Sequence, residues 1–463
     1  MPPVPNVRRI VGTLMVPTLT TVIMLAMFAV AVPFIRNDLG LAPDVASWLL
    51  VAYSLPHMML MPLYGRLADG IGKRRLLLTG ATLFAAGTAV LVVAGSFPML
   101  LLGRAIQGAG ASAVNPIAIA VIMEFVRPEK RGNALGTWNA SGPIAGVVGP
   151  LIAGGLIDAF GWRSILLPAL AVGLASIVLV WALLPESRRT GSLRGAVRSF
   201  DWVGVALFNG AIAMLVFFTS SRPITGADPL TDLRLLAGAL VLGTVFVWWS
   251  LRRDDPFIDL SIFRRRNFSV ASVTVSLRMV MRGGTGFLMP LFVTDLYGFN
   301  ASATGSLLML DAGSLLVTMW LGGLVIDRRR SRGQVIVGML IEALAMTSFL
   351  LLPAGAPVVW VFVILGANGL GAGYMLAALH VYAMGGVPEE ESATAAGLYS
   401  MIRFGGAMLG PAIGGVVLAA GVDEYGIAAA GYRPAFAFLL TVSIVGTVAA
   451  LLLTRRLPRE AGE

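Results

Sequence analysis

The amino-acid sequence contains repeated apolar runs, each about as long as a helix that crosses a lipid bilayer. Such a helix needs about 20 residues. The predicted membrane helices are 10–35, 46–64, 76–95, 98–125, 133–157, 163–184, 202–219, 234–251, 267–293, 302–326, 333–353, 357–384, 393–420 and 434–454. No segment alternates with the period of two that a barrel strand requires. The pattern therefore predicts an all-α polytopic membrane protein with fourteen spans.

The basic residues predict how these helices are oriented. The 34 lysines and arginines gather in alternate loops, with a bias of about five to one. By the positive-inside rule, this bias predicts that both termini are cytoplasmic and that the protein lies in the cell inner membrane. The net charge of +10 is spread over many short loops. It forms no single patch, so nucleic acid is not expected as a partner.

Two pairs of similar segments indicate an internal repeat. The segment GRLADGIGKRR at 65–75 corresponds to GGLVIDRRRSR at 322–332, and AGVVGPLIAGG at 145–155 corresponds to GAMLGPAIGG at 406–415. Both pairs are offset by eight helices. Tandem halves are common in secondary transporters. We therefore predict an N-terminal six-helix bundle (1–200), an inserted helix pair (201–260) and a C-terminal six-helix bundle (261–463).

These motifs resemble the major facilitator superfamily, and among its members the fourteen-helix drug:proton antiporter family. The loop motif carries Asp69, Lys73 and Arg74, and the segment LLGRAIQGAGASA at 101–113 resembles the helix-4 motif of that family. The resemblance implies the major facilitator fold and a transporter rather than an enzyme. The sequence differs from that family in one respect. Helix 1 lacks the aspartate that this family usually has, and Met24 occupies its position.

Charged residues inside predicted membrane helices are candidates for function, since each costs about 2.5–3.5 kcal/mol on insertion scales. Asp311 is estimated to lie at nearly the same depth as Arg278, and Arg282 lies one turn further along the same helix. An ion pair between Asp311 and one of these arginines is therefore predicted, with Asp311 as the proton-coupling acid. Glu342 is the second candidate, on a helix that the resemblance assigns to the outer layer. A permanent ion pair without a transport role is the alternative.

Other residues are assigned to four predicted groups, for each of which a purely structural role is the alternative. The charge partners within the membrane are Arg104, Arg278, Arg282 and Arg403. The cavity residues are Met24, Met27, His57, Gln107, Asn115, Met281, Asn368, Tyr374 and His380. The cytoplasmic gate comprises Asp69, Lys73, Arg74, Glu124 and Asp327. The helix-packing motif comprises Gly149, Pro150, Gly154, Gly410, Pro411 and Gly414.

The sequence thus predicts a proton-coupled exporter of hydrophobic or amphiphilic compounds. The expected partners are a small substrate of this kind, protons and membrane lipids, and the protein is expected to be a monomer. With no cysteine and two histidines, neither a metal site nor a cofactor is expected. An exporter or flippase of a lipid or anionic amphiphile is the alternative, because helix 1 has no acid and arginines are paired in the membrane. A membrane-bound enzyme or receptor is disfavoured, since no nucleophile–base constellation is evident.

Overall fold

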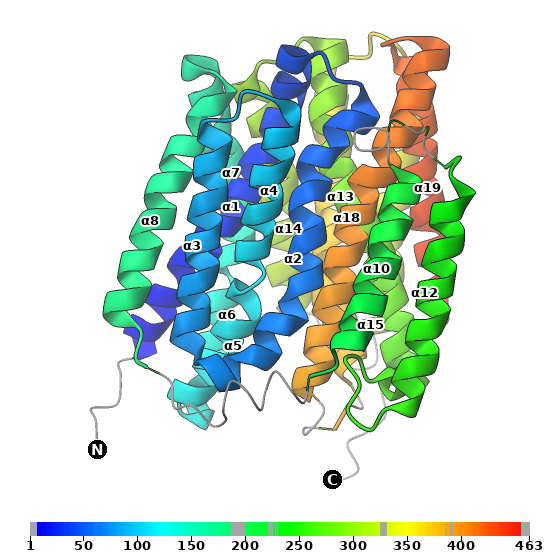
Figure 1. Ribbon diagram of the computed structural model, residues 1–463. Helices are drawn as coiled ribbons and strands as arrows, with labels where there is room; N and C mark the ends of the chain where they lie inside the picture. Colours follow the sequence, from blue (N-terminus) through cyan, green and yellow to red (C-terminus); the bar gives the residue numbers. More distant parts are fainter. Residues whose placement is uncertain are drawn as a thin grey trace. The chain divides into compact units, whose positions relative to one another are not determined.

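The computed structural model describes residues 7–186, 200–220, 226, 228, 230–324, 331–385, 387–388 and 392–454. All regular secondary structure in these ranges is helical (Figure 1). The chain divides into two compact units. Unit 1 comprises Met1–Phe34 and Leu49–Phe200, and unit 2 comprises Ile35–Trp48 and Asp201–Glu463.

Unit 1 contains the first six predicted spans. Its helices are α1 (Val7–Leu39), α2 (Pro43–Ile71), α3 (Lys73–Val92), α4 (Phe97–Ala111), α5 (Val114–Phe125), α6 (Pro128–Asn139), α7 (Ser141–Phe160), the short 3-10 turn η1 (Trp162–Ile165) and α8 (Leu166–Leu183). The end of α1 and the start of α2, residues 35–48, belong to unit 2. At one end of unit 1, α1, α5 and α6 enclose an apolar cluster of buried side chains.

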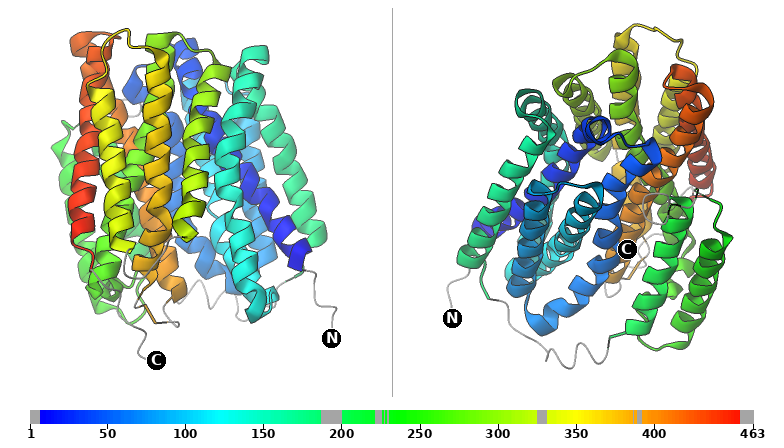
Figure 2. Two further views of the ribbon diagram at one scale, coloured as in Figure 1. Left: turned by 180° about the vertical axis from the view of Figure 1, so that it is seen from behind. Right: turned by 45° about the horizontal axis from the view of Figure 1, so that its top comes forward.

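Unit 2 contains the remaining eight spans. Its helices are α10 (Trp202–Thr219), α12 (Leu233–Arg252), the 3-10 turn η2 (Leu260–Arg264), α13 (Arg266–Tyr297), α14 (Ala301–Leu324), α15 (Ser331–Leu350), α16 (Val358–Tyr374), α17 (Leu376–Met384), α18 (Ser392–Tyr425) and α19 (Ala429–Leu451). Figure 2 shows α15 and α19 side by side when the molecule is seen from behind, in agreement with their contacts.

Three predicted spans, the fourth, the fifth and the twelfth, are each divided into two helices. The fourth span breaks between α4 and α5, where the amide of Ala113 donates to the carbonyl of Gly110 at 3.3 Å, a tighter turn than an α-helix makes. The fifth span breaks at Ala140, between α6 and α7, and the twelfth breaks at Met375, between α16 and α17. The fourth and twelfth spans are eight helices apart, which is the offset of the sequence repeat.

Hydropathy and length identify thirteen candidate membrane spans in the described ranges. The remaining predicted span, 267–293, forms α13, which has 32 residues but is not among the thirteen. At about 1.5 Å per residue, α13 is long enough to cross a bilayer. Its face carries Arg278 and Arg282, and it packs closely against α18. Arg278 is enclosed by protein, with 2% of its surface exposed, whereas 30% of the Arg282 side chain is exposed.

Glycines allow α13 and α18 to approach each other. A Cβ atom at Gly410 would overlap the carbonyl oxygen of Val280, and one at Gly406 would overlap that of Ser276. In unit 1, a Cβ at Gly149 would lie 2.9 Å from the Cβ of Ala26 on α1. Small residues at such contacts let helix backbones pack closely in a membrane. The two segments that the sequence repeats are thus both sites of close backbone packing.

The inserted helices α10 and α12 pack against each other (Figure 1), and α10 is fixed at both ends. At its start, the carboxylate of Asp201 accepts hydrogen bonds from the amides of Gly204 and Phe257 and from the indole of Trp249. Burial raises the pKa of Asp201, but these bonds and nearby Arg253 keep it below its usual value. Beyond its other end, the Trp48 indole donates to the Ser220 carbonyl at 2.6 Å.

Candidate functional site

A buried polar network joins α13, α14 and α16 in unit 2. The guanidinium of Arg282 forms an ion pair with the carboxylate of Asp311. The amide of Asn368 donates to the other oxygen of Asp311 at 3.1 Å. Asp311 is 3% exposed and Asn368 is equally buried. The cation and the amide both stabilise the ionised form of this carboxylate, so its charge depends on whether these two contacts are kept.

The backbone explains why these three side chains meet. Only residues 298–300 separate α13 from α14, so the two helices run antiparallel and Arg282 comes level with Asp311. Gly369 brings α16 against α14, because a Cβ there would overlap the carbonyl oxygen of Asp311. Asn368 is next to this glycine in the chain. A short loop and one glycine contact thus position the network.

A second group of charges lies beside this network. Arg278 donates to the carbonyl of Ala372 at 3.0 Å, and the buried Glu342 of α15 lies within electrostatic range of both Arg278 and Arg282. One oxygen of Glu342 has no hydrogen-bond partner among the described residues. Arg403 of α18 lies within electrostatic range of Arg278. Glu342 is therefore near enough to the arginines of α13 to interact with their charge, on a helix that the resemblance assigns to the outer layer.

Unit 1 buries an arginine in a different environment. Arg104 of α4 is 0% exposed, donates to the carbonyl of Leu49 at 2.8 Å and donates to Gln107 at 3.0 Å. Its guanidinium lies over the rings of Phe28 and Tyr53, at 4.0 and 4.5 Å from their centroids. One of its nitrogens has no hydrogen-bond partner in the described part of the chain. Within the described ranges, two aromatic faces, one backbone oxygen and one side-chain amide oxygen contact this cation, and no ion pair with a carboxylate is formed.

A third ionic network, which the sequence did not predict, lies in unit 2. Arg36, at the end of α1, forms a bidentate ion pair with Asp295 near the end of α13. The hydroxyl of Tyr432 on α19 donates to the same carboxylate at 2.6 Å. The sequence placed Arg36 in an outer loop and did not single out Asp295. The position of Asp295, an acid in the last turns of a long apolar helix, was the feature of the sequence that could have indicated this network.

The predicted gate residues separate into two contacts. Lys73 forms an ion pair with Glu124 at 2.7 Å, and both residues belong to the predicted gate group. Arg74 instead donates to the carbonyl of Trp181 and lies 3.9 Å from Glu186. Asp327 and the side chain of Asp69 lie outside the described residues.

The remaining predicted cavity residues are distributed over both units. Met24, Met27 and Gln107 are buried in unit 1, and Met281 is buried in unit 2. The ring of His57 packs edge-on against Tyr53, and that of His380 packs edge-on against Tyr399. Asn115 and Tyr374 are half-buried next to the breaks in the fourth and twelfth spans. The structure therefore brings Asn368, but not the two histidines, to the Asp311 network.

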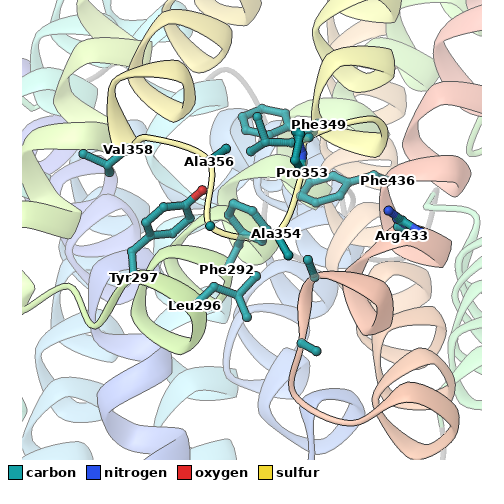
Figure 3. Close-up of a pocket in the computed structure, with 14 residues that line it drawn as sticks. Phe292, Leu296, Tyr297, Phe349, Pro353, Ala354, Ala356, Val358, Arg433 and Phe436 are labelled. Carbon is teal, nitrogen blue, oxygen red and sulfur yellow. The ribbon is translucent and has the colours of Figure 1, made fainter.

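One pocket of unit 2, of about 430 Å³, lies where α13 and α15 end and α16 and α19 begin. Figure 3 shows the rings of Phe292, Phe349 and Phe436 around residues 353–356, with Tyr297 and Arg433 on opposite sides. This pocket is separate from Asp311. No group of three or more potential metal ligands occurs in the described ranges.

Comparisons with known proteins agree with this architecture. The family model of the Major Facilitator Superfamily matches residues 14–411. The chain is 29% identical to the multidrug resistance protein Stp of Mycobacterium tuberculosis, over 84% of this chain and 72% of that protein. It is 31% identical to a probable actinorhodin transporter of Streptomyces coelicolor, over 84% and 68% of the two chains.

A solved structure supports the fold independently of close sequence similarity. The crystal structure of a bacterial homologue of the human lysosomal transporter Spinster, inward-facing and unoccupied, aligns with a TM-score of 0.71. The alignment covers 99% of this chain and 100% of that one, at 17% identity. Together with the helical spans, these matches establish that the chain belongs to the Major Facilitator Superfamily and is a multi-pass membrane transporter.

Proposed function

We propose that this transporter exports hydrophobic or amphiphilic compounds in exchange for protons, by alternating access. It lies in the cell inner membrane, with both termini in the cytoplasm, as the basic loops predict. The names of the relatives, a multidrug resistance protein and a probable actinorhodin transporter, support export. An ion gradient would supply the energy, since one proton crossing 100 mV releases about 2.3 kcal/mol.

The ion pair of Arg282 and Asp311 is the observation that carries this proposal. In the state described, the guanidinium stabilises the ionised carboxylate. When the helices rearrange and the pair separates, the carboxylate remains in an apolar environment and takes up a proton. Asn368 can donate to Asp311 in either protonation state, because the second oxygen stays an acceptor. Asp311 thus carries a proton when the pair is separated and carries none when the pair is formed.

The test is transport by the purified protein in liposomes under an imposed pH gradient. Asp311→Asn resembles the protonated acid, so it should abolish gradient-driven export of a dye while leaving dye binding close to wild type. Asp254→Asn, which removes an exposed acid from a loop, is the matched control and should export normally. Normal export by Asp311→Asn together with its loss in Glu342→Gln would move the proton site to Glu342. Normal export by both variants would argue against proton coupling.

A second function, export or flipping of an anionic amphiphile or lipid, is favoured by one observation. Arg104 is fully buried, is surrounded by aromatic faces and keeps one nitrogen without a hydrogen-bond partner among the described residues. Such a cation suits an anionic head group better than a cationic drug. The same liposomes distinguish the two functions when a cationic dye and an anionic amphiphile are compared. Selective transport of the anion, independent of the pH gradient, would support the second function.

A further inference from the structure

A pocket of about 820 Å³ opens at the end of unit 1 where the chain enters α1. It lies between the first two turns of α1, the end of α5 and the helix α6. The indole of Trp138 on α6 donates to the hydroxyl of Thr18 on α1 at 2.9 Å. This bond joins the two helices just beyond the pocket, on the side toward the middle of the span. The pocket is therefore bounded on its inner side by a contact between α1 and α6.

The lining of this pocket is amphipathic. Its apolar floor is formed by Val7, Val11, Met15, Phe125 and Ala134, which belong to the core cluster of this end of unit 1 or pack against it. Its rim carries three exposed cations and one exposed acid. These are Arg8, Arg127, Lys130 and Glu129. The rim thus has an excess of positive charge directly above an apolar floor.

We propose that this pocket binds an anionic phospholipid, with its phosphate at Arg8, Arg127 and Lys130 and the upper part of an acyl chain along the floor. Three features support this occupant. The volume is in the range of ligand sites, the charge complements a phosphodiester, and basic pockets between membrane helices favour anionic head groups. Bound there, the lipid bridges α1 and α6.

The lining offers two independent ways to remove the site. Arg127→Gln with Lys130→Gln removes charge from exposed positions and leaves the floor intact. Gly12→Trp fills the pocket and leaves the charge intact, because a Cβ at Gly12 meets nothing within 4 Å. Matched controls are Arg264→Gln with Arg265→Gln, in another basic segment, and Gly155→Trp, at an open position on α7.

The experiment is native mass spectrometry of the delipidated full-length protein, titrated with phosphatidylglycerol or phosphatidylcholine. Wild type and both controls should bind phosphatidylglycerol in preference to phosphatidylcholine. At about 1 kcal/mol per basic residue, the double glutamine variant should bind phosphatidylglycerol about 30-fold more weakly. Gly12→Trp should lose the tight adduct without any change in charge.

Three results would overturn the proposal. Unchanged phosphatidylglycerol affinity in Gly12→Trp would mean that the basic rim attracts lipid without using the pocket. Equal binding of phosphatidylcholine would reduce the site to an apolar groove. Displacement of the lipid by a transported dye, with a raised KM for that dye in Gly12→Trp, would assign the pocket to cargo instead.

Discussion

Units 1 and 2 both bury arginines within membrane helices, but they stabilise these cations in different ways. In unit 1, Arg104 is held by a backbone carbonyl, Gln107 and two aromatic rings. In unit 2, Arg282 is paired with a carboxylate, and Arg278 lies near a second one. Among the described residues, only the second arrangement places carboxyl groups beside the arginines. The proposed function therefore assigns a fixed cation to unit 1 and a variable charge to unit 2.

The largest effect on stability is expected when only one residue of the Arg282–Asp311 pair is replaced. Arg282→Met leaves a buried carboxylate without its cation, which should lower the free energy of unfolding by about 3–5 kcal/mol. Unfolding by SDS in mixed micelles measures this loss. The double variant Arg282→Met with Asp311→Leu should recover most of it, since no buried charge of the pair remains. Failure of the double variant to recover would show that the pair is not the source of the loss.

A smaller effect is expected from the corresponding change in unit 1. Arg104→Met removes two hydrogen bonds and two cation–π contacts, but it also removes the cost of burying a cation that has no acid beside it. The free energy of unfolding should therefore change by no more than about 1–2 kcal/mol. The same micelle assay measures it. A loss as large as that of Arg282→Met would remove the distinction between the two units.

The smallest effect on stability is expected for the amides that support each arginine network. Asn368→Leu removes one side-chain hydrogen bond, and Gln107→Leu removes two, with Arg104 and Thr88. Each variant should cost about 1–2 kcal/mol, with Asn368→Leu at the lower end. Their effects on transport should differ. Asn368→Leu should shift the pH dependence of the export rate, because Asn368 contacts Asp311, whereas Gln107→Leu should not. Identical pH profiles for the two variants would argue against Asp311 as the proton site.

The sequence predicted most of the fold, because apolar runs of membrane length leave few alternatives. All fourteen predicted spans correspond to helices in the described ranges. The breaks at residues 112–113, 140 and 375 were not predicted, because each lies inside an apolar run of membrane length. They are seen only in the backbone hydrogen bonds of the structure.

The candidate site was predicted less completely, since depth along a helix does not determine which side chains meet. The sequence placed Arg278 level with Asp311, with Arg282 one turn away. The structure pairs Asp311 with Arg282, while Arg278 reaches a carbonyl of α16. An error of one helical turn, about 5.4 Å, is enough to exchange the two arginines. Glu342 was assigned to an outer helix by resemblance, which gave no information on the direction of its side chain.

The contacts at both ends of α10 limit how members of the superfamily can gain or lose the inserted helix pair. Joining residue 200 directly to residue 261 would remove Asp201 and Ser220 together, and the buried indole of Trp48 would lose both of its acceptors. A buried donor left without a partner costs about 1–3 kcal/mol. We therefore expect the residue at position 48, in the second turn of α2, to differ between members with and without the extra helices. Sequences of twelve-helix and fourteen-helix members, compared at position 48, would reveal this dependence.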